Sequence, residues 1–228
     1  MQYKQKEIKM RIRFKKWARP ELEASPFYID EPEKYKEKWS SMYSTKAPFH
    51  IELGCGKGGF ISQIASQNPS IHYLGIDLVD AMLGIAKRKI ESVYQQENRE
   101  INNVLLTRYD IERIQTILGK QDQVERIYIN FCNPWPKPKH KKKRLTHPKQ
   151  LESYQTFLLP GGEIHFKTDD DGLFQDSLNY FQQTGFVILK STIDLHQDQW
   201  EGNVITEHEK MFSEQGIKIK ALIAKYPN

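Results

Sequence analysis

The sequence predicts an α/β fold in which one doubly wound, mainly parallel sheet carries helices on both faces. Two observations predict it: short apolar runs alternate with segments of helical periodicity, and a glycine-rich turn follows the first of these runs. The chain has 228 residues, of which 38% are hydrophobic, and this suits a single domain with its own core. In such folds ligands bind beyond the carboxyl ends of the strands, so functional residues are expected directly after strands.

The alternation holds along most of the chain. Seven strands are predicted, at residues 49–53, 73–77, 104–107, 126–131, 163–167, 185–189 and 217–225. Helices are predicted from residue 60 and at residues 81–91, 111–118, 151–159 and 173–182. Pro160-Gly161-Gly162 is expected to break the fourth of these helices. The last strand alternates apolar and polar residues, which predicts a place at or near a sheet edge.

Positive charge is concentrated in two segments of a chain whose formal net charge is +5. Residues 1–20 are predicted to be a basic, mobile extension that an anionic partner orders, and residues 21–228 to be the single domain. In the second segment, Lys137 to Arg144, six of the eight residues are Lys or Arg. So dense a cluster beside a predicted strand end favours phosphate contacts with a nucleic acid. The RNA-binding candidates are Lys139, His140, Lys141, Lys142, Lys143 and Arg144.

The cysteines, the apolar runs and the histidines indicate which classes of protein are not expected. Cys55 and Cys132 are the only cysteines, too few for a disulfide framework, which is typical of the reducing cytoplasm. The longest apolar runs fall short of a membrane helix, so no membrane partner is expected. The histidines lack the spacing of metal ligands, and no metal site is predicted.

The turn after the first predicted strand reads Glu52-Leu53-Gly54-Cys55-Gly56-Lys57-Gly58 and resembles motif I of class I methyltransferases. Gly54-x-Gly56-x-x-Gly59 also matches the dinucleotide fingerprint, but Glu52 would repel a pyrophosphate. A carboxylate there suits a ligand with an ammonium and a sulfonium, which favours S-adenosylmethionine. The cofactor-binding candidates in this turn are Glu52, Gly54, Gly56 and Gly58.

Two further acids follow the next two predicted strands. Asp77 ends the second strand, where a carboxylate can accept hydrogen bonds from both ribose hydroxyls. Asp110 follows the third, within reach of the exocyclic amine of adenine. Because acids follow three successive strands, we predict that this edge of the sheet binds the adenosine part of the cofactor.

The fourth predicted strand leads into Asn133-Pro134-Trp135-Pro136-Lys137 and then Arg144-Leu145-Thr146. This segment resembles the D-P-W-P-K and R-R-L-T signature of the bacterial tRNA (guanine-N7)-methyltransferase family. Further segments resemble the same family: Met10-Arg11-Ile12-Arg13, Lys16-Trp17-Ala18, His165-Phe166-Lys167-Thr168-Asp169, Asp194-Leu195-His196, and Glu201-Gly202-Asn203-Val204-Ile205-Thr206-Glu207 with Glu209. The resemblance spans about residues 10 to 225, which leaves Met10 open as an alternative start.

The resemblance implies a Rossmann-like class I methyltransferase fold and transfer of the methyl group of S-adenosylmethionine to N7 of guanine 46 in the variable loop of tRNA. By position, it implies that Asn133 contacts the cofactor and has the catalytic role. The substrate-binding residues that it implies are Lys137, Asp169, Thr206, Glu207, His208 and Glu209. Monomer and homodimer both remain open.

One position departs from the family pattern, which has Asp where this chain has Asn133. Guanine N7 presents an in-plane lone pair and needs no deprotonation, so in-line positioning is the main requirement. Asn133 keeps a carbonyl oxygen for orientation but lacks a charge to stabilise the cationic product. We therefore predict a slower enzyme that is still active.

Two alternatives remain. Asn133-Pro134-Trp135 is similar to the Asn-Pro-Pro-aromatic motif of methyltransferases that act on exocyclic amines, which would yield a methylated adenine or cytosine amine. A family member without activity would bind tRNA and S-adenosylmethionine but transfer no methyl group. The methylated nucleoside distinguishes a guanine-N7 methyltransferase from an amine methyltransferase. A cofactor titration tests the interpretation as an inactive binding protein.

Overall fold

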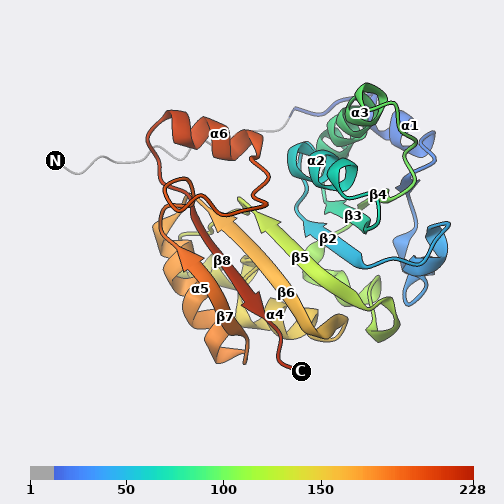
Figure 1. Cartoon of the computed structure of the whole chain (residues 1–228). Coiled ribbons are helices and arrows are strands. Elements are labelled where there is room, and N and C mark those ends of the chain that lie inside the picture. The colour runs from blue at the N-terminus through green and yellow to red at the C-terminus, as the bar shows by residue number, and fades with distance from the viewer. Residues whose placement is uncertain (1–12) are drawn as a thin grey trace.

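The structure is a computed structural model that describes residues 13–228. Within that range one sheet of eight strands forms, in the order β1-β4-β3-β2-β5-β6-β8-β7 (Figure 1). The strands are β1 Tyr28–Ile29, β2 Phe49–Leu53, β3 His72–Asp77, β4 Val104–Arg108, β5 Val124–Asn130, β6 Leu158–Thr168, β7 Val187–Thr192 and β8 Lys220–Lys225. All neighbours pair in parallel except β8, which is antiparallel to both β6 and β7.

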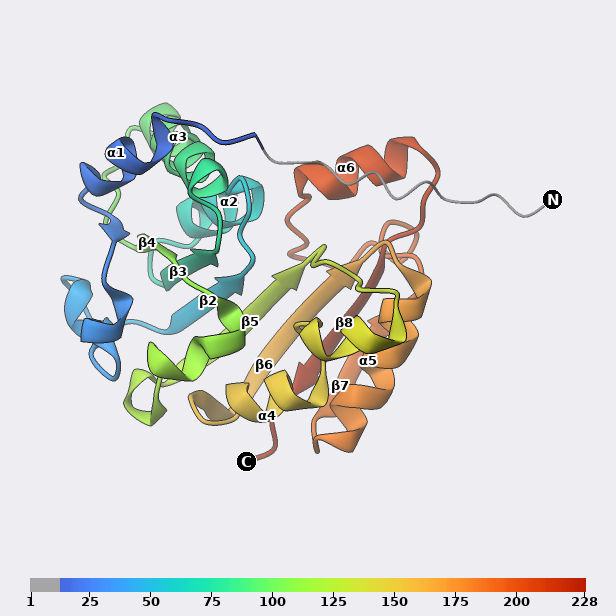
Figure 2. The same ribbon diagram turned by 180° about the vertical axis from the view of Figure 1, so that it is seen from behind.

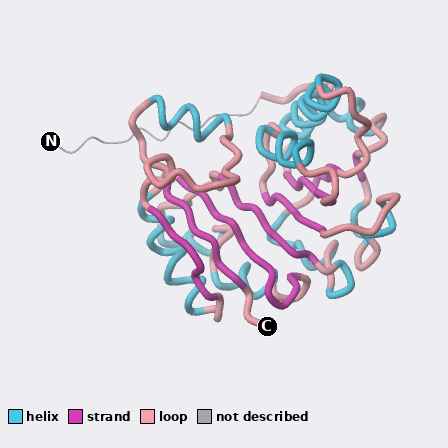
Figure 3. The backbone as a smooth tube through the Cα atoms, in the orientation of Figure 1, coloured by secondary structure: helices cyan, strands magenta, loops and turns pink. Residues whose placement is uncertain are grey.

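Helices lie on both faces of this sheet (Figures 1 and 2). On one face, α1 Ala18–Glu23, α2 Gly59–Gln67 and α3 Asp80–Gln96 gather over β2, β3 and β4. On the other face, α4 Pro148–Tyr154 and α5 Asp171–Gln183 lie behind β5, β6 and the last two strands. The remaining helix, α6 Glu207–Glu214, lies beyond the carboxyl ends of β5 and β6 (Figure 3). The predicted doubly wound α/β class is confirmed.

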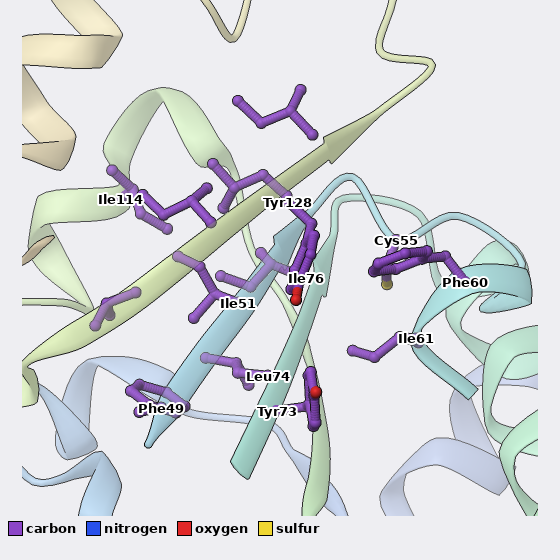
Figure 4. Close-up of a cluster of buried hydrophobic side chains, with 14 of the residues drawn as sticks. Phe49, Ile51, Cys55, Phe60, Ile61, Tyr73, Leu74, Ile76, Ile114 and Tyr128 are labelled. Atoms are coloured by element: carbon purple, nitrogen blue, oxygen red, sulfur yellow. The ribbon is translucent and has the colours of Figure 1, made fainter. Parts of the chain in front are cut away.

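The core joins the central strands to the first layer of helices (Figure 4). Ile51 of β2, Leu74 of β3 and Ile61 of α2 are fully buried. Phe60 of α2 and Tyr128 of β5 stack at a tilt, with ring centroids 4.8 Å apart. This packing sets the start of α2, and with it the glycine turn, against the carboxyl end of β2.

The two edges of the sheet are formed by β7 and β1. The strand expected at residues 217–225 is β8, and it lies between β6 and β7, one strand from the edge of the sheet, so its predicted place at or near an edge is confirmed. β7 forms that edge, and the opposite edge is the two-residue β1, an eighth strand that was not predicted. Strand pairing between distant segments depends on packing that local periodicity does not report.

The helix predicted at residues 151–159 ends early, at Tyr154, and β6 already begins at Leu158. Pro160-Gly161-Gly162 therefore lies inside a strand, where Gly161 adopts φ +79° at a shift in the register with β5. A glycine at positive φ is typical of such an irregularity, so here it bends a strand and does not end a helix. The predicted helix at residues 111–118 is a 3₁₀ segment, Ile111–Thr116.

Helices α1 and α6 are additional to the prediction. α1 begins at Ala18, inside the predicted extension, and Ala18 is fully buried against α3, where its Cβ lies 2.8 Å from the position that a Cβ on Gly84 would take. Residues 18–20 are thus part of the packed structure. Residues 1–12, including Met10 and most of the predicted extension, lie outside the described residues. Over residues 13–228, the structure has no helix that is both long and apolar enough to cross a membrane.

Candidate functional site

The site begins at the point in the sheet where the strand order reverses, between β2 and β5. The turn after β2 folds back on β3, because the N–H groups of Gly54 and Cys55 both donate to the carbonyl of Ile76, at 2.8 and 3.0 Å. Gly54, Gly56 and Gly58 adopt φ values of +77°, +53° and +74°. A Cβ on Gly58 would lie 2.7 Å from the Cβ of Ala86, so this turn also allows α2 and α3 to approach closely.

Glu52 lies beneath this turn and is only 3% exposed. Its Oε1 accepts a hydrogen bond from Nδ2 of Asn130 at 3.1 Å, whereas its Oε2 is buried and accepts none from any described residue. Burial raises the pKa of Glu52 to about 8. An enclosed carboxylate oxygen with an empty acceptor position suits a cationic ligand group that brings its own N–H donors.

The other two predicted acids are at the same edge of the sheet. Asp77 holds the turn in place, because its Oδ2 accepts the N–H of Gly56 and its Oδ1 that of Val79, each at 2.9 Å. Each oxygen keeps a further lone pair, so the half-buried carboxylate can still accept ligand hydroxyls. Asp110 follows β4 and accepts the N–H of Glu112 at 3.0 Å, which caps the 3₁₀ segment. The structure therefore aligns the three acids at the carboxyl ends of β2, β3 and β4.

Asn133 follows β5 in a sharply bent segment. Phe131 and Trp135 both adopt positive φ, 53° and 41°, and the Oδ1 of Asn133 accepts the N–H of Trp135 at 3.2 Å. Its side chain is exposed. The bend follows the carboxyl end of β5, and the Nδ2 group of Asn133 takes no part in this turn contact.

The basic loop divides into anchored and exposed residues. Arg144 is only 2% exposed, and its guanidinium donates to the carbonyl of Pro134 at 2.7 Å and pairs with Asp176 of α5 at 2.5 Å. Lys141 pairs with the same carboxylate at 2.6 Å. These two residues fix the loop to α5, which leaves Arg144 without the surface access that a phosphate contact requires. Exposed basic side chains remain at Lys137, Lys139, Lys142 and Lys143.

Aromatic rings accompany this basic surface. Nζ of Lys143 lies 5.2 Å from the centroid of the Trp135 ring, and the His140 ring lies 5.7 Å from it at a tilt. A half-exposed indole among cations is typical of surfaces on which RNA bases stack.

The four residues at the start of α6 have different surroundings. Thr206 and Glu209 are buried, and the Oγ1 of Thr206 accepts the N–H of Glu209 at 3.0 Å as the helix cap. Glu207 and His208 are exposed. Glu207 pairs with Lys89 of α3, and its Cγ lies 3.6 Å from the position that a Cβ on Gly59 would take. This places the start of α6 over the glycine turn.

His208 and Asp169 are near the carboxyl ends of β5 and β6. The His208 ring stacks on Phe131 with centroids 5.9 Å apart. The ring is partly desolvated where it stacks on Phe131, and this desolvation and the nearby charge of Lys57 lower the pKa of His208, so its imidazole is neutral at neutral pH. Asp169 directly follows β6, and burial raises the pKa of its carboxyl group. The structure thus brings Glu52, Asn133, Asp169 and α6 together around one edge.

Two residues of the site were not singled out from the sequence. Asn130 donates to Glu52, and Lys167 of β6 is almost buried beneath the segment that leads into α6. Their position was the available signal, because both residues lie at the carboxyl ends of predicted strands, where functional residues are expected. No group of three or more His, Cys, Asp or Glu side chains placed for a metal ion occurs among the described residues.

The raised pKa of Glu52 predicts a pH dependence for the binding of S-adenosylmethionine that is expected at this carboxylate. An ammonium ligand binds the ionised carboxylate, and burial keeps this group protonated below about pH 8 in the free protein. We therefore expect the affinity for S-adenosylmethionine to rise with pH, by up to about tenfold per unit, between about pH 5.5 and 7.5. Calorimetric titrations across this range, in buffers of different ionisation enthalpy, measure both the affinity and the proton released. A flat profile without proton release would contradict the assignment.

A sheet of this order, with a glycine turn after β2 and acids at the carboxyl ends of three adjacent strands, defines a class I methyltransferase. Solved structures share the fold. The 16S rRNA methyltransferase KamB superposes with a TM-score of 0.61 at 14% identity, covering 84% of this chain and 93% of that one. A phosphoethanolamine N-methyltransferase 2 of Haemonchus contortus, in complex with S-adenosyl-L-methionine, gives a TM-score of 0.52 at 14% identity, over 82% of this chain and 50% of that one.

Sequence comparison identifies the family. A family model described as "Putative methyltransferase" matches residues 46–222. The tRNA (guanine-N(7)-)-methyltransferase of Clostridium beijerinckii is 58% identical over 96% of this chain and all of its own length. Those of Clostridium perfringens and Ruminiclostridium cellulolyticum are 55% and 54% identical over 95% of this chain, covering 99% and 92% of their lengths. The chain belongs to the tRNA (guanine-N(7)-)-methyltransferase family, and the resemblance inferred from its motifs is confirmed.

Proposed function

We propose that this chain transfers the methyl group of S-adenosylmethionine to N7 of guanine 46 in the variable loop of tRNA. The observation that carries the proposal is the buried Oε2 of Glu52 under the glycine turn, which has no hydrogen-bond partner within residues 13–228, in a chain that is 58% identical to a tRNA (guanine-N(7)-)-methyltransferase. The first feature suits the cofactor, and the second gives the substrate class.

The residues around the turn fit this cofactor. Glu52 would accept the ammonium of the methionine part, Asp77 the ribose hydroxyls, and Asp110 the exocyclic amine of adenine. Gly54 and Gly56 leave open space where a Cβ would stand, so the backbone can approach the ligand closely. When bound, S-adenosylmethionine supplies an electrophilic methyl group on a sulfonium.

The guanine would lie beyond the ends of β5 and β6, between Asn133 and the start of α6. Its N7 lone pair is the nucleophile, so the protein has to orient the base and needs no general base. Lys137, Asp169, Glu207 and His208 would bring polar groups to this space, and Glu207 lies over the start of α2, beside Gly59. Trp135 offers a ring face on which an unstacked base can lie.

The exposed part of the basic loop supplies the surface for the tRNA backbone. Lys139, Lys142 and Lys143 are exposed, and His140 lies beside Trp135 in the same loop. Contacts with phosphates position an RNA without reading its sequence. Choice of the guanine would then come from the shape of the tRNA presented to this edge.

Asn133→Asp is expected to raise kcat about tenfold, with little change in the KM for tRNA. The added charge would face the positive charge that develops on N7-methylguanine, and electrostatic stabilisation of this kind reaches about 3 kcal/mol in a dry site but less at an exposed side chain. The exposed Asn133 carboxamide leaves room for the isosteric carboxylate. Single-turnover rates of the two proteins measure the effect. A rate for Asn133→Asp at or below that of the parent would contradict the proposed role.

The proposed target is tested with two tRNA transcripts that differ only at position 46. The guanine transcript is expected to accept one labelled methyl group, and the transcript with adenine 46 is expected to accept none. Equal labelling of both transcripts would exclude guanine 46 as the target. Binding of both transcripts with equal affinity is the control that the substitution leaves the tRNA folded.

A further inference from the structure

We infer that Lys167 and Glu209 are positioning residues that hold the segment 203–209 over the site, and that Glu209 acts through this segment without touching the guanine. The inference rests on the proposed function, because it assigns how that site presents its substrate-facing residues. It also reassigns Glu209, which the family pattern alone would place against the base.

The geometry of Glu209 shows a side chain turned inward. Its side chain is 0% exposed, and its Oε2 lies 3.0 Å from the Nζ of Lys167, which is itself only 12% exposed. Its Oε1 accepts the Nδ2 of Asn203 at 2.7 Å and lies 3.3 Å from the Nε2 of His196. Both carboxylate oxygens are thus engaged by the protein, in contrast to Glu52, whose Oε2 has no partner among the described residues.

Lys167 completes this network from the sheet. Its Nζ donates to the carbonyl of Val204 at 3.0 Å, to the carboxylate of Glu209 at 3.0 Å, and to the Oδ1 of Asn203. These contacts use all three donors of the ammonium. A single side chain near the carboxyl end of β6 therefore binds the backbone and two side chains of a segment that is about 40 residues further along the chain.

The anchored segment carries the exposed residues of α6 toward the glycine turn. Glu209 is tied to Lys167, and the cap between Glu209 and Thr206 fixes the first turn of the helix. Glu207 and His208, which lie between these two residues, then face Gly59 and Phe131. Loss of the ion pair would leave a buried charge without a partner, which is strongly destabilising locally.

The test uses Lys167→Met, Glu209→Met and the double variant Lys167→Met/Glu209→Met. Each single variant leaves one buried charge unpaired, so the KM for tRNA is expected to rise at least about tenfold, while affinity for S-adenosylmethionine changes by less than about twofold. The double variant removes both charges, and apolar replacement of a buried pair is often neutral, so its KM is expected to return to within about threefold of the parent. Asn203 is half-exposed, and water can replace the partners it loses.

Arg126→Met is the matched control. Arg126 also forms an ion pair with a β6 carboxylate, Glu163 at 3.0 Å, on the same face of the sheet but near the amino ends of the strands. Its loss is expected to leave the KM for tRNA unchanged. Hydrogen exchange of residues 196–214 is the readout independent of methyl transfer: it should be faster in both single variants and restored in the double variant.

Three results would overturn the inference. A double variant as impaired as Glu209→Met would show that Glu209 contacts the guanine directly. An unchanged KM in Lys167→Met would show that the ion pair does not hold the segment. A parallel loss of cofactor affinity in the single variants would show a general role in folding. If the parent protein methylates no tRNA, the proposed function fails, whereas the exchange measurement still tests the positioning role.

Discussion

Glu52→Gln is expected to weaken binding of S-adenosylmethionine about 100-fold, because it removes the buried charge that would face the ammonium of the cofactor in the proposed site. Losing one partner of a buried, hydrogen-bonded charge pair costs about 2–5 kcal/mol of binding free energy, and a loss of affinity of about 100-fold lies within these limits. The effect should be specific to the cofactor, because Asn130 can still hydrogen-bond the new amide oxygen. Isothermal titration of the two proteins with S-adenosylmethionine measures the change.

The same substitution is expected to leave the free protein folded. Because burial raises the pKa of Glu52 to about 8, its side chain at neutral pH is largely protonated, and glutamine has the shape of that neutral form. Glu163→Gln is the control, since Glu163 is a half-buried carboxylate that pairs with Arg126 on β5. An affinity within about threefold of the parent for Glu52→Gln would remove Glu52 from the cofactor site.

Replacing Lys139, Lys142 and Lys143 together by alanine is expected to weaken tRNA binding about 30-fold or more. All three side chains are exposed on the basic loop, whereas Arg144 and Lys141 are held by Asp176. Each lost phosphate contact should also reduce the slope of log affinity against log salt, by about 0.7 to 0.9. Binding measured at several salt concentrations gives both values.

The control for this experiment removes the same charge elsewhere. Lys34, Lys36 and Lys38 are exposed and precede β2, at the end of the sheet away from the site. Alanine at these three positions should leave tRNA affinity and its salt slope within error of the parent. Equal losses from both triple variants would mean that net charge, and not the basic loop, determines binding.

The cofactor half of the site was predictable because it depends on short-range signals. A strand, a glycine turn and a helix follow one another directly, and the predicted bounds of β2, residues 49–53, match the structure. Asp77 and Asp110 then come to the same edge because parallel strands end together. Their placement at this edge can be predicted from the alternation of strands and helices alone.

The substrate half depends on contacts between distant residues, which periodicity does not show. Glu209 and Lys167 are 42 positions apart, and only their juxtaposition shows that the carboxylate is engaged. Arg144 stands within a run of similar basic residues, and the sequence contains no sign that this one is buried against Asp176, 32 positions away. α6 was missed because its segment is mostly polar and lies over the end of the sheet, with little apolar surface to bury.

The central claim is methyl transfer to guanine N7 in tRNA. The most direct test incubates the purified protein with methyl-labelled S-adenosylmethionine and unmodified tRNA, digests the RNA, and identifies the labelled nucleoside by mass spectrometry. The account predicts labelled N7-methylguanosine and no other labelled nucleoside. A label on an adenine or cytosine amine, or no label from a protein that binds both the cofactor and the tRNA, would contradict it.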